Sequence, residues 1–305
     1  MGDICKGDNM DNTMIVAVIN GNGKIRYSQP LEMFLRGNRS IPIINYYTGQ
    51  KLFDILFDEL GIIRYEDNKF ALKTIIEMNV KNSVMKIAGK VAEAVIVRRC
   101  NSDNEINKKW LSLARRQTIR SKTVEKFHAI GTGLLSTKQK FPTRYDVSNP
   151  QRDIMWIDND GKTALVKGSS YCAGLEAGLQ IKVSKDGKAY FFNDLVKMKY
   201  EIPVVYFDIC NDFDSIANDL YNLRNRNAGI SINIGEDFVS ARAVDYNAYQ
   251  EVLYHIDLID ALISGKITPE QLIDTAARSD SSSLKNAIFS AGLSQIDFNN
   301  IILGS

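Results

Sequence analysis

Four polar residues in the middle of the chain have the types needed to hold a divalent cation beside a phosphate group. Asp153 begins an apolar segment, and Gln180 and Lys182 stand two residues apart in a later one. Glu93 lies upstream, in a stretch rich in alanine and valine. Carboxylate and amide oxygens bind hard cations such as Mg²⁺, and a neighbouring lysine can orient water or stabilise charge on a phosphate. These residue types therefore indicate hydrolysis of phosphodiester bonds.

The apolar patterning around these residues predicts the elements that must position them. Gln180 and Lys182 share one face of an expected strand, because side chains alternate, and the apolar residues beside them share the other. The expected order is a helix over residues 84–99, then strands over residues 153–157, 163–166, 179–183 and 203–209, with a hairpin turn at 159–161. The fully apolar run at 203–209 is typical of a buried central strand.

This order of residues and elements resembles the PD-(D/E)xK nuclease superfamily, which includes restriction endonucleases and Holliday-junction resolvases. The resemblance covers about residues 84–210. It implies an α/β fold with a restriction-endonuclease-like mixed central sheet flanked by helices. It also implies a catalytic set in which Lys182 assists the attacking water. In that set Mg²⁺ or Mn²⁺ is bound by Asp153, Gln180 and Glu93.

The chain departs from the family pattern at Gln180, where an acidic residue is usual. A glutamine donates a neutral oxygen, so the expected metal site carries one negative charge fewer. A methylation-dependent restriction branch of the superfamily is similar in using glutamine here. Glu176 lies four residues earlier and shares the face of Gln180 if the strand begins before Gly178. We therefore include Glu176 among the expected metal ligands as a hypothesis.

Each candidate also has an ordinary structural interpretation. Asp153 can cap a strand or pair with a nearby arginine, and Lys182 can be an exposed strand lysine. Glu93 points almost opposite to the apolar face that the valines and isoleucine of residues 84–95 form, so a solvated glutamate is an open alternative. These alternatives remain open from the sequence.

Basic residues gather between the expected helix and the Asp153 strand. Residues 108–144 contain ten lysines and arginines and one glutamate, a local charge of +9 in a chain of net charge +2. Such a segment favours contacts to the phosphates of a nucleic acid, although a solvated basic helix over residues 105–127 is the plain alternative. The candidate nucleic-acid-binding residues are Lys108, Lys109, Arg115, Arg116, Arg120, Lys122, Lys138, Lys140 and Arg144.

The remaining sequence divides into a unit on each side of this core. Residues 1–80 predict a small α+β unit, with a strand at 14–19 and helices at 48–60 and 70–78. Residues 81–235 predict the nuclease core, with residues 131–149 as a loop. Residues 236–305 predict a helical appendage with helices at 249–263 and 281–291.

The rest of the composition limits location and metal chemistry. The four cysteines are scattered, which predicts free thiols in a reducing cytoplasm. The two histidines stand far apart, which excludes a two-histidine zinc helix. No apolar stretch is long enough to span a membrane. We therefore expect a cytoplasmic protein whose metal is held by oxygen atoms.

Together these features predict a Mg²⁺-dependent endodeoxyribonuclease, of the type II restriction or antiviral-defence kind. Double-stranded DNA is the expected partner, and a homodimer is expected if the target site is palindromic. Two alternatives stay open. One is a protein with a nuclease-like fold that binds nucleic acid without cutting it, and the other is a nuclease for RNA or branched DNA.

Overall fold

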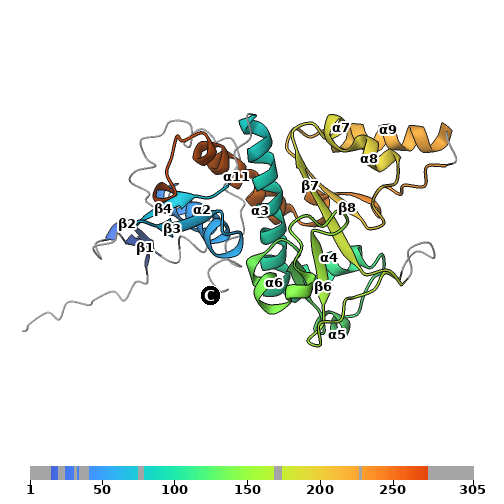
Figure 1. Ribbon diagram of the computed structural model, residues 1–305, viewed down its shortest axis with the longest axis horizontal. Helices are drawn as coiled ribbons and strands as arrows, with labels where there is room; N and C mark the ends of the chain where they lie inside the picture. Colours follow the sequence, from blue (N-terminus) through green and yellow to red (C-terminus); the bar gives the residue numbers. More distant parts are fainter. Residues whose placement is uncertain are drawn as a thin grey trace, which may run out of the picture.

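The protein is an α/β structure built on a mixed five-stranded sheet packed with helices (Figure 1). The computed structural model describes residues 15–19, 25–30, 33, 41–74, 79–167, 174–226 and 229–273, with the backbone alone for 15–19, 25–29 and 41–47. The sheet contains β5 (His128–Gly131), β6 (Ile154–Ile157), β7 (Gly178–Ser184), β8 (Val204–Asp208) and β9 (Phe238–Ser240), in that order. The first three strands are antiparallel, and β7, β8 and β9 run parallel.

The long helix α3 (Val80–Ser102) lies between the sheet and the N-terminal unit (Figure 1). Its middle, from Val91 to Val97, is buried without interruption, because the helix contacts β5 and β7 on one side and α11 (Tyr246–Ile263) on another. A helix that is apolar on all sides is stable only when neighbours cover every face. This complete cover explains how a glutamate in the middle of α3 comes to be buried.

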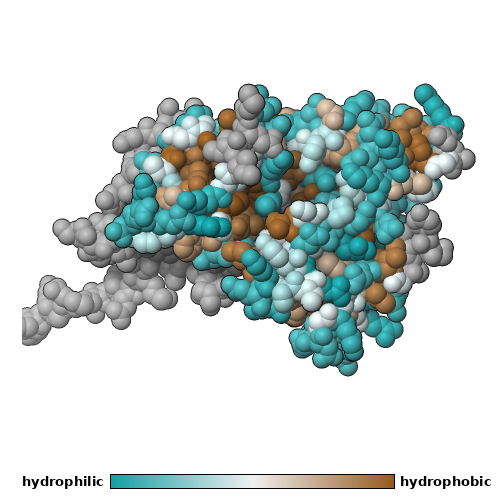
Figure 2. All heavy atoms as spheres, in the orientation of Figure 1, coloured by the Kyte–Doolittle hydropathy of each residue, from teal (hydrophilic) through white to brown (hydrophobic). Residues whose placement is uncertain are grey.

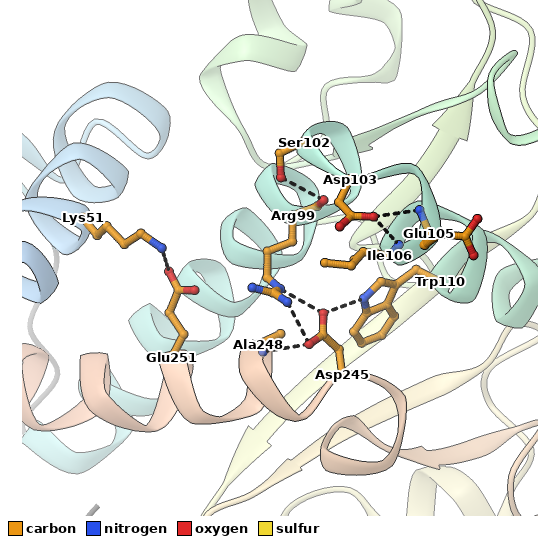
Figure 3. A network of polar contacts seen from close by, with 10 residues as sticks. All are labelled: Lys51, Arg99, Ser102, Asp103, Glu105, Ile106, Trp110, Asp245, Ala248 and Glu251. Carbon is orange, nitrogen blue, oxygen red and sulfur yellow. Dashed lines mark hydrogen bonds and ion pairs between the residues drawn. The ribbon is translucent and has the colours of Figure 1, made fainter. Parts of the chain in front are cut away.

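A buried acidic residue joins three helices of the core (Figure 3). Asp245 caps the start of α11 by accepting a hydrogen bond from the backbone of Ala248. Its carboxylate also accepts two hydrogen bonds from Arg99 of α3, at 2.9 and 3.1 Å, and a longer one from Trp110. Trp110 belongs to α4 (Asn104–Ala114) and is fully buried, so it packs this helix into the core.

The remaining helices surround the sheet on both sides (Figure 1). In this view α5 (Ser121–Val124) lies below β6 and α6 (Leu135–Lys140) lies to its left. The 3₁₀ turn η2 (Pro142–Arg144) follows α6 in the chain. Above β7 lie α7 (Gly187–Tyr190), α8 (Phe192–Val196) and α9 (Phe213–Arg226). The short α10 (Ala241–Val244) follows β9, and η3 (Glu270–Leu272) follows α11.

The N-terminal unit contains two hairpins and a helical segment. The hairpins pair β1 (Ile15–Ile19) with β2 (Ile25–Pro30) and β3 (Ile63–Glu66) with β4 (Lys69–Leu72). Between them α2 (Ile41–Asp54) continues into the π-helical turn η1 (Ile55–Glu59). Gly61 adopts a φ of +62°, a conformation that glycine favours, and ends this helical segment as expected.

Several expected elements are confirmed, with small shifts at their ends. The helix expected at 84–99 is α3, the strands at 153–157 and 179–183 are β6 and β7, and the helix at 249–263 is α11. The strand expected at 203–209 is β8, which is buried along its whole length between β7 and β9. The return strand at 163–166 is reduced to single bridges, Ile157 to Thr163 and Leu165 to Glu176.

Other expectations are wrong. The expected helix over 105–127 is broken after Ala114, because Arg116 adopts a φ of +50°. The loop expected at 131–149 begins with the end of β5 and contains α6. The helix expected at 70–78 begins as strand β4, and the part from 75 to 78 lies outside the described residues. Strand β9, in the region expected to be a helical appendage, belongs to the central sheet.

The described residues also bear on the cysteines and on membranes. Cys100 is a buried free thiol and Cys210 an exposed one. Cys5, Cys172 and the helix expected at 281–291 lie outside the described residues. None of the helices in the described ranges is both long and apolar enough to cross a membrane.

Candidate active site

Asp153 occupies the junction between β6 and β7, directly before the first residue of β6. Its backbone N–H donates to the carbonyl of Leu179 at 2.9 Å, which holds the residue against β7. One carboxylate oxygen accepts a hydrogen bond from the backbone of Ile181 at 2.7 Å and another from the Gln180 side chain at 2.5 Å. Burial raises the pKa of Asp153 to about 6, although these donors and the charge of Lys182 oppose the rise.

Glu93 reaches the same place from α3. It is 5 % exposed, and its Oε1 accepts a hydrogen bond from the backbone of Gly133 at 3.0 Å. Burial raises the pKa of Glu93 to about 8, and the nearby charge of Asp153 adds to the rise. The alternative of a solvated glutamate is therefore wrong, because the second face of α3 is covered as well. Two carboxylates from distant parts of the chain thus lie close enough for the charge of Asp153 to affect Glu93.

Gln180 and Lys182 complete this group from β7. Gln180 is 5 % exposed, and its side-chain oxygen Oε1 is buried with no hydrogen-bond partner in the described part of the chain. Burial lowers the pKa of the Lys182 ammonium, while Asp153 raises it, so the two side chains interact electrostatically. The alternative of an ordinary exposed lysine does not fit this environment. The structure therefore brings together Glu93, Asp153, Gln180 and Lys182.

The donor set fits a hard cation that keeps part of its water shell. Within the residues that the structure describes, no group of three histidine, cysteine, aspartate or glutamate residues could hold a metal ion. Two carboxylates and the unpartnered Gln180 oxygen are nevertheless present, and Mg²⁺ is often bound through one or two carboxylates with water completing the shell. A cation between Glu93 and Asp153 would also offset the charge of Asp153, which contributes to the raised pKa of Glu93.

Glu176 lies outside this group. Its carboxylate binds Arg144 at 2.8 Å and accepts a hydrogen bond from Thr163 at 3.0 Å. The strand β7 begins only at Gly178, where a Cβ would come within 2.8 Å of the backbone oxygen of Ile154. Glu176 therefore precedes the strand and does not share the face of Gln180. The hypothesis that Glu176 is a fourth metal ligand required it to share that face.

Two of the basic residues expected to contact nucleic acid serve the interior instead. Arg115 is 8 % exposed and donates to the carbonyl of Leu165 at 3.0 Å. The Arg116 guanidinium binds Asp237 at 2.6 Å and the carbonyl of Glu201 at 3.1 Å. Arg115 thus joins the end of α4 to the segment between β6 and β7, and Arg116 joins it to the segments before β8 and β9, so neither arginine is available to a partner.

The other candidate basic residues lie in two segments of the chain. Lys138, Lys140 and Arg144 lie on α6 and η2, after the Gly133 turn; Arg144 pairs with Glu176, and burial, together with the charge of Lys140, lowers the pKa of His128 at the far end of β5. The others lie on or near α4 and α5, where Asn107 binds the carbonyl of Phe127 next to the same end of β5. The two ends of β5, His128 and Gly131, are three residues apart along the strand, which corresponds to about 10 Å. Hydrophilic residues dominate the lower edge of the molecule there (Figures 1 and 2). This second set comprises Lys108, Lys109, Arg120, Lys122 and Lys126.

Sequence reasoning missed the turn that holds Glu93. A Cβ on Gly131 would lie 2.4 Å from Oε1 of Glu93, so this glycine makes room for the carboxylate. Thr132 donates its backbone N–H to the carbonyl of Asp153 at 2.8 Å, which ties the same turn to the second carboxylate. The signal available in the sequence was the pair Gly131 and Gly133, two residues apart after an apolar stretch.

Comparison of the chain with protein-family models, with curated proteins and with solved structures finds no match in any of the three. The resemblance to the nuclease superfamily therefore remains an expectation from the residues and their order along the chain.

Proposed function

We propose that this protein is a Mg²⁺-dependent endonuclease that hydrolyses phosphodiester bonds in DNA. The observation that carries the proposal is the convergence of the buried Glu93, the unpartnered amide oxygen of Gln180 and the half-buried Asp153 and Lys182 at one junction of the sheet. Perturbed titratable groups that share a site are typical of catalytic centres. The identity of these residues and their order along the chain support phosphodiester hydrolysis among the possible reactions.

In this proposal Glu93, Asp153 and Gln180 hold the cation. A bound Mg²⁺ would supply charge neutralisation at the scissile phosphate and a more acidic water. The hydrogen bonds from Ile181 and Gly133 fix the two carboxylates, so little reorganisation is needed when the site is occupied.

Lys182 is placed to act on the reacting phosphate. Hydrolysis forms a bond between phosphorus and a water oxygen, breaks one phosphorus–oxygen ester bond, and gives the leaving oxygen a proton. Burial lowers the pKa of Lys182, and the charge of Asp153 opposes this lowering. A charged ammonium in a partly water-free site stabilises the negative charge that develops on the phosphate more strongly than an exposed one. Lys182 also has the donors to orient the attacking water.

The resemblance to restriction endonucleases supports a role in restriction or antiviral defence, with double-stranded DNA as substrate and a homodimer as the assembly. Within the described residues, the exposed Lys138 and Lys140 of α6, which follows the Gly133 turn, are our candidates to bind the phosphates around the cut. The basic residues on and near α4 and α5 would bind DNA phosphates farther from the cut, beyond the His128 end of β5.

The test is cleavage of plasmid and phage DNA with Mg²⁺ or Mn²⁺, with and without EDTA. We expect fragments with the metal and none with EDTA. Lys182→Ala should lose activity by about 100-fold or more, whereas Lys185→Ala, an exposed lysine just beyond the same strand, should cut like the wild type. Undiminished cutting by Lys182→Ala would place the active site elsewhere.

A second candidate is a protein that binds nucleic acid without cutting it. The neutral Gln180 and the lack of a third acidic or histidine ligand among the described residues favour this candidate. Salt-sensitive DNA binding combined with intact DNA under every metal condition would select it over the nuclease.

A further inference from the structure

Two tyrosines stand beside Lys182, and neither belongs to the proposed metal site. The Lys182 ammonium lies 6.0 Å from the ring centroid of Tyr190 and 5.2 Å from that of Tyr200. Tyr190 is the last residue of α7, and Tyr200 follows α8. Both rings are within the range in which a cation is attracted to an aromatic face.

The two rings differ in how they are held. Tyr200 is partly buried, and its hydroxyl donates to Asp194 at 3.0 Å, which fixes the ring. Tyr190 is 60 % exposed. Its neighbour Phe191 is buried and meets it edge to face, so the backbone beneath Tyr190 is anchored while its ring faces solvent. An anchored, solvent-facing aromatic ring beside a catalytic lysine is a surface on which a flat apolar group can stack.

The flat group expected at the Tyr190 ring is a nucleobase. A phosphate bound by Lys182 carries its nucleoside only a few bonds away, within reach of a ring 6.0 Å from the ammonium. Every base has a π face, and aromatic side chains in single-strand-binding proteins stack on such faces. Inside a duplex both faces of each base are already covered by its neighbours, so a stacking partner must be an unpaired base.

We propose that Tyr190 stacks on an unpaired nucleobase next to the phosphate bound by Lys182, so that this site accepts a nucleotide held out of the double helix. The inference rests on the proposed function, which supplies the phosphate at Lys182. It adds a preference for single-stranded or locally opened DNA and assigns that preference to one residue.

The test measures binding in EDTA, where no cleavage is expected. The probes are a fluorescein-labelled 16-nucleotide oligothymidylate and a labelled blunt 16-base-pair duplex, followed by fluorescence anisotropy at one low salt concentration. The variants are Tyr190→Phe, which keeps the ring, and Tyr190→Leu, which keeps apolar cover over Lys182 without a ring. Since Tyr190 is exposed, both variants should fold like the wild type.

The proposal gives a specific pattern. Tyr190→Phe should bind both probes within about twofold of the wild type, since stacking needs only the ring. Tyr190→Leu should bind the single strand about 5- to 150-fold more weakly and the duplex within about twofold. Equal single-strand binding by Tyr190→Leu and wild type, an equal loss on both probes, or no single-strand binding by the wild type would each overturn it.

Failure of this inference can be told apart from failure of the proposed function. If the wild type cuts DNA with Mg²⁺ and Tyr190→Leu matches it in cleavage and in single-strand binding, the stacking proposal alone fails. If no DNA is cut with any metal, the proposed function fails, whatever the anisotropy shows.

Discussion

At the residue scale, Glu93 carries the largest electrostatic penalty of the proposed site. Its pKa rises from an ordinary value of 4.5 to about 8, first because the carboxyl is buried and second because Asp153 is close. The folded protein therefore binds more protons than the unfolded chain between these values. For such a group the free energy of unfolding falls as pH rises, by up to about 1.4 kcal/mol for each pH unit.

Replacing Glu93 by glutamine should remove this penalty. We expect Glu93→Gln to raise the free energy of unfolding of the metal-free protein by about 1–3 kcal/mol at pH 8.5. The gain should vanish near pH 5, where Glu93 is already neutral in the folded state. Chemical denaturation in EDTA at both pH values measures it. A variant less stable than the wild type at pH 8.5 would mean that Glu93 is stabilised by charges that this account omits.

Gly131 and Gly133 form a matched pair for testing the Glu93 position. A Cβ at Gly131 would lie 2.4 Å from Oε1 of Glu93 and 2.6 Å from Cγ of Leu134, whereas at Gly133 the nearest atoms are 3.6 Å away. Gly131→Ala should lower stability by about 1–3 kcal/mol and raise the Mg²⁺ concentration needed for half-maximal cleavage. Gly133→Ala should change stability by less than about 0.5 kcal/mol. If Gly131→Ala and Gly133→Ala changed stability equally, the turn would have to rearrange at little cost in free energy to accept the added Cβ.

The sequence could predict part of this site because strands have a simple period. Gln180 and Lys182 share a face by alternation alone, and Asp153 stands at the start of a recognisable apolar segment. The position of Glu93 depended on tertiary packing, since α3 is covered on both faces and periodicity on one helix cannot report its neighbours. For the same reason the sequence offered no way to separate the internal Arg116 from exposed basic residues.

At the scale of elements, α3, α4 and α11 are joined through the Asp245 carboxylate. Its side chain is 8 % exposed and that of Arg99 12 %. Asp245→Ala should lower the free energy of unfolding by about 3–5 kcal/mol, because it leaves the buried guanidinium of Arg99 without its partner. Lys162→Ala is the control, since its ion pair with Asp160 is 78 % exposed on both sides and should contribute less than about 1 kcal/mol. Equal losses in urea denaturation would contradict the role assigned to Asp245.

The elements that the sequence missed are short and lie between stronger signals. Strand β9 has three residues, and β5 has four that follow a basic segment. Such strands exist because a neighbouring strand completes their hydrogen bonds, as β8 does for β9 and β6 does for β5. Their own residues carry little pattern, whereas the periodic or continuously apolar segments that form α3, α11, β6, β7 and β8 were predictable.

At the scale of the whole molecule, basic side chains next to the site should set how DNA binding depends on salt. Lys138 and Lys140 are exposed and follow the turn that holds Glu93. Replacing both by alanine should reduce the slope of log K against log salt by about 1–2, since each duplex phosphate contact contributes about 0.9. Lys69→Ala, an exposed lysine of the N-terminal hairpin, should leave the slope unchanged. An equal change with Lys69→Ala would mean that binding is spread over the whole surface.

The most direct test of the central claim is the rate of plasmid cleavage against Mg²⁺ concentration at pH 6.5 and pH 8.5. Metal binding to Glu93 and Asp153 must displace their protons, because the metal-free pKa values are about 8 and about 6. We therefore expect the half-saturating Mg²⁺ concentration to fall about tenfold or more from pH 6.5 to pH 8.5, and Glu93→Gln to be inactive at both. Cleavage without Mg²⁺, cleavage by Glu93→Gln at the wild-type rate, or intact plasmid throughout would contradict the account.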